Sequence, residues 1–185
     1  MNHTDKTIYA DDDKESIGLL LRLRIPPLIV GLVLGIGVSF LTSRFEEVIA
    51  TNVNVVFFIP FVVYIAAAVG SQTHSIYSRD LKNGHAKFRN YIFKEMLLGI
   101  ALGTIFGAIS WGVVSLWLAD AALAKSLGLA VFGAVAVAPL IALITAELLN
   151  DLHEDPAVGS GPIATVIQDA TSIFIYGAIT SLILL

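Results

Sequence analysis

Long apolar stretches separated by shorter polar segments dominate the chain after its first two dozen residues. Five of these stretches, at 25–41, 53–69, 96–118, 127–148 and 163–185, approach the roughly 20 residues with which an α-helix crosses about 30 Å of hydrocarbon. Residues 1–23 are polar and include an acidic run, which indicates a short tail ahead of one domain at 24–185. The pattern predicts an all-α integral membrane protein with five transmembrane helices.

The basic residues are distributed unevenly along this pattern. If the N-terminus is cytoplasmic, the tail and the predicted loops 70–95 and 150–161 carry nine Lys and Arg, whereas the outer loops carry only Arg44 and Lys125. Cytoplasmic segments are the ones enriched in Lys and Arg. We therefore expect a multi-pass protein of the cell (plasma) membrane, with a cytoplasmic tail and the C-terminus outside. The outer segment 43–54 is either a short amphipathic helix or a plain loop.

The amino-acid composition limits the kinds of chemistry that the chain can carry out. Hydrophobic residues make up 56% of the chain and charged residues only 14%, against roughly a quarter charged in soluble domains. The absence of cysteine excludes disulfides and thiolate metal sites. No Ser/His/Asp set or nucleotide-binding loop is visible, so we expect no enzyme, and the lipid bilayer rather than nucleic acid is the expected surrounding.

Asp169 is the outstanding candidate for a functional residue. It is the only charged residue in the last apolar stretch, about 10 Å along the helix from Pro162. No Lys or Arg follows Lys125, so a proton or a mobile cation is the expected partner for this costly carboxylate. Thr165 and Ser172, at i−4 and i+3, share its helical face and predict a polar stripe toward a wet cavity or another helix. The alternative is a protonated Asp169 bonded to a neighbouring hydroxyl.

A second group of acids follows the fourth apolar stretch. Glu147, Asp151, Glu154 and Asp155 fall on one face if the helix continues. Acids without bases at the cytoplasmic end of a span attract cations, and a solvated helix end is the alternative. Oxygen ligands of this kind suit Mg²⁺ or Ca²⁺ better than copper or zinc. His153, and likewise His74 and His85 in the predicted loop 70–95, are interpreted as solvated loop histidines.

Small residues recur at helical spacing in several spans. Gly99, Gly103 and Gly107 form one stripe, and Gly31 and Gly35 form a shorter one. Such stripes permit close approach of helix backbones. We interpret the stripe at 99–107 as ordinary helix packing.

Three stretches of the chain resemble the membrane domain of the MgtE magnesium channel family. They are PFVVYIAAAVGSQTHSIYSR at 60–79, KEMLLG at 94–99, and DPAVGSGP at 155–162 followed by Asp169. The resemblance implies a homodimer with a pore on its two-fold axis, built from the second and fifth spans of each chain. It further implies that Asp169 holds a hydrated Mg²⁺ on the axis and that Asp155 binds metal at the cytoplasmic mouth.

The second span adds further expected pore-lining residues. Ala68 and Ser71, together with Thr165 and Ser172, are expected to face the pore. The family usually has Gly-Asn where this chain has Ala67-Ala68, so the resemblance implies that an amide that lines the family's pore is missing here. The family's cytoplasmic sensor with paired CBS domains has no counterpart in this sequence, so gating through it is not expected.

Three transport hypotheses stay open at this stage. The first is a Mg²⁺-preferring dimeric channel for divalent cations. The second is an exchanger that couples a divalent cation to Na⁺ or H⁺. The third is a non-conducting membrane subunit that pairs with a related, paralogous chain.

Overall fold

The computed structural model describes residues 13–150 and 160–185, and these residues fold into helices without a strand. The helices are α1 (Ile17–Ser43), α2 (Glu46–Thr51), α3 (Asn54–Lys82), α4 (Phe88–Leu118), α5 (Ala121–Asn150) and α6 (Ser160–Leu184). All but the short α2 are long and apolar enough to cross a membrane, which confirms the five predicted spans. The segment 43–54 contains α2, so the helical alternative for it is correct.

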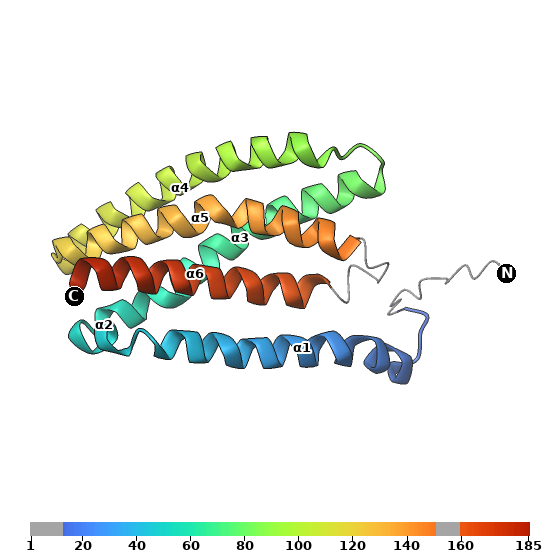
Figure 1. Ribbon diagram of the computed structural model, residues 1–185, viewed down its shortest axis with the longest axis horizontal. Helices are drawn as coiled ribbons and strands as arrows, with labels where there is room; N and C mark the ends of the chain where they lie inside the picture. Colours follow the sequence, from blue (N-terminus) through green and yellow to red (C-terminus); the bar gives the residue numbers. More distant parts are fainter. Residues whose placement is uncertain (1–12, 151–159) are drawn as a thin grey trace.

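The long helices form one bundle around α5. In Figure 1, α4, α5, α6 and α1 lie side by side, while α3 crosses behind them from α2 at one end to α4 at the other. In the most apolar stretch of α5, 56% of the residues are buried, whereas no residue is buried in the most apolar stretch of α1. The helix α1 packs on α6 and leaves its other faces uncovered. The centre of the fold is therefore α5, and α1 is peripheral.

The segment 70–95, predicted as a loop, is mostly helical. The helix α3 continues to Lys82 and α4 begins at Phe88, so the connection is only 83–87. Polar side chains in the extensions bond to neighbouring helices: the Thr73 hydroxyl donates to Glu95 Oε2 at 2.8 Å, and the Tyr77 hydroxyl donates to Glu147 Oε2 at 2.6 Å. The prediction was wrong because hydropathy marks only the apolar part of a helix, whereas these polar groups are satisfied between helices.

The glycine stripe of α4 lies directly against α5. A Cβ atom added to Gly99, Gly103 or Gly107 would come within 2.7 Å of a carbonyl oxygen of α5. No side chain fits at these positions unless the two backbones separate. The prediction that this stripe serves helix packing is confirmed. At Gly35 in α1, by contrast, an added Cβ would meet nothing within 4 Å.

One polar contact joins the turns at the end of the bundle that carries the C-terminus (Figure 1). Asp120 caps α5, because its Oδ1 accepts a hydrogen bond from the Leu123 amide at 2.9 Å. Its Oδ2 accepts another from the Asn52 side-chain amide, also at 2.9 Å. This carboxylate therefore ties the α2–α3 turn to the α4–α5 turn, where Ala119 takes a left-handed conformation (φ 52°).

Candidate cation pathway

Asp169 lies on a face of α6 that the bundle covers only in part. Tyr176 and Thr180, at i+7 and i+11, share its face and are 2% and 0% exposed. Asp169 itself is only half-buried, so the neighbouring helices cover this face of α6 less completely at Asp169 than at Tyr176 and Thr180. It makes no hydrogen bond or ion pair with any other residue that the structure describes. A half-buried acid in an apolar helix, with no partner in the described part of the chain, is a candidate ion site.

A cavity of about 230 Å³ lies beside this position, between α3, α5 and α6. Its polar lining comes from Ser71, His74, Ser75, Thr145, Thr165 and Gln168. Since Ser71, Ser75 and Thr165 are exposed, the cavity opens at the surface of the chain. It is roomy and polar enough for ordered water. Thr165 lies one helical turn before Asp169, so the cavity and the carboxylate occupy adjacent parts of α6.

The four residues predicted to line a pore separate into two pairs. Thr165 and Ser71 line this cavity, whereas Ala68 is half-buried on α3 and is not part of its lining. Ser172 is fully buried. Its hydroxyl donates to the backbone carbonyl of Gln168 at 2.8 Å and accepts from the side-chain Nε2 of Gln168 at 3.3 Å. The Ser172 hydroxyl is thus enclosed within the chain and does not share an open stripe with Asp169.

The second acidic group is described only at its first member. Glu147 is half-buried and accepts the hydrogen bond from Tyr77 that joins α5 to α3. The remaining acids, Asp151, Glu154 and Asp155, lie outside the described residues. Their predicted roles as a cation funnel and a metal site therefore stay predictions, and His153 stands with them.

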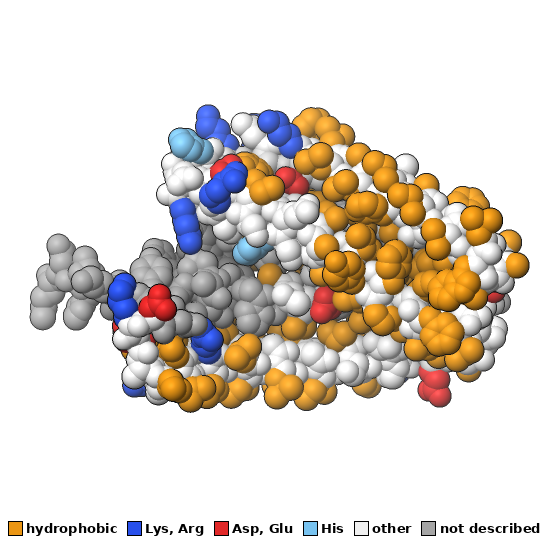
Figure 2. All heavy atoms as spheres, turned by 180° about the vertical axis from the view of Figure 1, so that it is seen from behind, with side chains coloured by type: hydrophobic (Ala, Val, Ile, Leu, Met, Phe, Trp, Pro, Cys, Tyr) orange, Lys and Arg blue, Asp and Glu red, His pale blue; other side chains and the backbone are white. Residues whose placement is uncertain are grey.

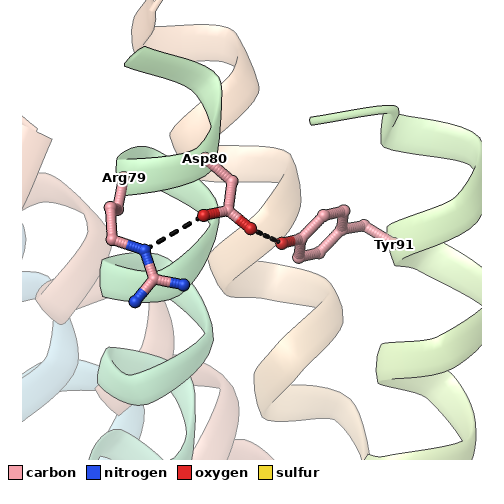
Figure 3. A network of polar contacts seen from close by, with 3 residues as sticks. All are labelled: Arg79, Asp80 and Tyr91. Atoms are coloured by element: carbon pink, nitrogen blue, oxygen red, sulfur yellow. Dashed lines mark hydrogen bonds and ion pairs between the residues drawn. The ribbon is translucent and has the colours of Figure 1, made fainter. Parts of the chain in front are cut away.

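A contrasting acid, Asp80, lies near the C-terminal end of α3. Asp80 accepts a hydrogen bond from the Tyr91 hydroxyl of α4 and pairs with Arg79 Nε at 3.0 Å (Figure 3). This carboxylate has a cationic partner within the protein, whereas Asp169 has none among the residues that the structure describes. Lys and Arg side chains gather at this end of the bundle in Figure 2, while hydrophobic side chains cover much of the rest of that face.

Sequence reasoning missed three polar residues in the helices. His74, predicted to lie in a loop, is in α3 and lines the cavity, which corrects its assignment. Gln168 is 5% exposed and borders the same cavity. Glu95 is 8% exposed and has Thr73 as its hydrogen-bond donor. The available signal was a polar side chain inside or beside an apolar span, as at Gln168 directly before Asp169.

These features define the class of protein: a multi-pass helical membrane protein with a polar cavity and, beside it, an acid that has no partner among the described residues. Within residues 13–150 and 160–185, no three His, Asp or Glu side chains gather into a metal cluster.

Comparison with known proteins identifies the family. A family model described as MgtE, a divalent cation transporter, matches residues 59–179. The magnesium transporter MgtE of Enterococcus faecalis is 32% identical over 162 residues, which cover 86% of this chain and 36% of that protein. The MgtE proteins of Bacillus subtilis and Thermus thermophilus are 27% and 26% identical, and they cover 85% and 87% of this chain and again 36% of their own length.

The chain belongs to the MgtE family of divalent cation transporters. This is a family of transporters rather than enzymes. The chain spans about a third of the length of the curated relatives that it matches, 36% in each case, and corresponds to part of the MgtE membrane region.

Proposed function

We propose that the chain conducts a divalent cation, Mg²⁺ above all, through a pore on the axis of a two-fold dimer with Asp169 as the central ion site. The observation that supports this most is the half-buried Asp169, without a partner among the described residues, beside a cavity that opens at the surface. In the proposed orientation the N-terminal tail is cytoplasmic and the C-terminus lies outside.

A dimer accounts for the charge on Asp169. A two-fold axis brings the same surface of two copies together, so two carboxylates would face each other. Like charges at close range favour protonation of one group unless a cation lies between them. A divalent ion matches the charge of the pair. Mg²⁺ gives up its water reluctantly, so the proposed site holds it through its hydration shell.

The acids after α5 extend the proposed pathway toward the cytoplasm. Asp155 is the proposed second metal-binding residue, and Asp151 and Glu154 would attract cations to the mouth. Glu147 is committed to Tyr77 by a 2.6 Å hydrogen bond, so its part in attracting cations is secondary to its part in joining α5 to α3.

The test is Mg²⁺ flux into liposomes that contain only this chain. Asp169→Asn should abolish the flux while the dimer remains intact. Glu47→Gln is the matched control, because Glu47 is an exposed acid on α2 away from the cavity, and its flux should equal that of the unchanged chain. Undiminished Mg²⁺ flux in Asp169→Asn would refute the proposal.

The same liposomes separate the other transport modes. A channel needs only the Mg²⁺ gradient, whereas an exchanger stops when Na⁺ and the proton gradient are removed. A non-conducting subunit would give no flux alone and would gain it only with a related chain.

A further inference from the structure

Two buried polar atoms beside the cavity lack hydrogen-bond partners. Gln168 Oε1 and His74 Nδ1 are both inaccessible to solvent and unbonded among the described residues. The Ala142 carbonyl interacts with the imidazole, but Nδ1 makes no hydrogen bond of normal geometry. Buried polar atoms are seldom left unpaired, because each then bears its full desolvation cost. Both residues line the same cavity, so a small rotation of either side chain would bring its unpaired atom to a ligand or water there.

Ser172 fixes which end of the Gln168 amide faces the cavity. The Ser172 hydroxyl donates its only hydrogen to the backbone carbonyl of Gln168. Toward the Gln168 side chain, the hydroxyl oxygen can therefore act only as an acceptor. The amide nitrogen must therefore point at Ser172, where Nε2 lies 3.3 Å away. The amide oxygen consequently points the other way and offers a lone pair.

Gly70 lets that oxygen lie against α3, one turn from His74. A Cβ added to Gly70 would lie 3.2 Å from Gln168 Oε1, so a side chain there would crowd the amide. Gly70 and His74 are four residues apart, and residues at this spacing share a helix face. The amide oxygen therefore lies against the face of α3 that carries His74, and Gln168, His74, Ser71 and Thr165 all belong to the cavity lining.

We propose that this cavity is a binding site for a divalent transition metal, with the His74 imidazole and Gln168 Oε1 as protein ligands and water completing the shell. A neutral imidazole keeps one nitrogen lone pair for a metal, and imidazole suits Ni²⁺ or Zn²⁺ whereas Mg²⁺ takes oxygen ligands and keeps its water. Among the described residues, no Lys or Arg lines the cavity to repel a cation, and the next residue after Gln168 is the acid Asp169.

This inference rests on the proposed transport function, because that function places the site beside the route of the transported cation. The site would make His74 a determinant of metal preference: transition metals would dwell in the cavity, and Mg²⁺ would pass it with its water shell intact.

The test is Ni²⁺ binding to the purified, tag-free chain in detergent, measured by calorimetry. The chain has four histidines, so replacing His3, His85 and His153 by alanine leaves His74 alone. This variant should bind one Ni²⁺ per chain. Adding His74→Ala or His74→Gln should weaken that binding by at least the roughly 10–100-fold typical of losing even a supporting metal partner. Gln168→Met should weaken it less than the loss of His74.

Three results would overturn the metal site. One is the absence of Ni²⁺ binding in the chain that keeps only His74. The second is equal Ni²⁺ affinity with and without His74, which would leave water as the cavity's occupant. The third is an affinity that Gln168→Met leaves unchanged. The His74→Gln variant guards against misfolding, since it keeps a polar side chain of similar size. These results are independent of Mg²⁺ flux, so failure of the metal site and failure of the transport proposal can be told apart.

Discussion

Gly99→Ala tests how closely α4 and α5 must approach. The added methyl group would lie 2.5 Å from the Ala136 carbonyl oxygen and 3.2 Å from its carbon. All the atoms it meets are backbone atoms, so no side-chain rotation can relieve the clash. A normal carbon–oxygen contact needs about 3.3 Å, so the two helices must separate locally by roughly 0.8 Å. A radial gap of about 0.5–1 Å forfeits a quarter to a half of the dispersion attraction across it.

The net cost follows from two opposing effects. Overpacking of this kind costs about 1–3 kcal/mol, and the gain in helix propensity from Gly to Ala returns at most about 1 kcal/mol. We therefore expect Gly99→Ala to lower the free energy of unfolding by about 1–2 kcal/mol. Gly112→Ala is the matched control in the same helix, because a Cβ there would meet nothing within 4 Å, and it should be neutral or stabilising.

The assay is reversible unfolding in mixed micelles with increasing denaturing detergent, followed by circular dichroism. The reasoning requires Gly99→Ala to unfold at a lower detergent fraction than the unchanged chain, with Gly112→Ala at or above it. If the two variants unfold together, the glycine stripe does not set the distance between α4 and α5.

Two further predictions concern polar contacts between helices, measured in the same assay. Tyr77→Phe removes the hydrogen bond to Glu147 and should destabilise the protein by about 1–3 kcal/mol, as expected for a bond to a carboxylate; unchanged stability would mean that water replaces the hydroxyl. Thr73→Val leaves the buried Glu95 without its donor and should cost about 1–3 kcal/mol, whereas Thr104→Val, whose exposed hydroxyl bonds only its own helix, should cost far less.

The sequence was a good guide to the helices and a poor guide to their ends. Apolar runs located all five spans, because the need to satisfy backbone groups in lipid leaves little alternative to a helix. The end of α3 was misplaced because the polar side chains of Thr73 and Tyr77 are typical of loops. In the fold they are accommodated in a helix, since they bond to Glu95 and Glu147. Such partners come from other parts of the chain, and a local pattern cannot reveal them.

The site was predictable only in part for a related reason. Asp169 stands out in any reading of the last span, because it is the only charge there. Helical spacing also placed Ser172 near its face, but a modest rotation around the helix decides between cavity and core. The structure buries Ser172 against Gln168. That choice depends on how α6 packs against its neighbours, which the sequence alone does not specify.

An experimental map of the dimer in Mg²⁺ would test the central claim most directly. The proposal predicts density for a divalent ion on the two-fold axis between the two copies of Asp169, with the carboxylate oxygens about 4 Å or more from the metal because one water layer intervenes. An Asp169 side chain that points at lipid, or that is enclosed within one subunit with no ion on the axis, would contradict it.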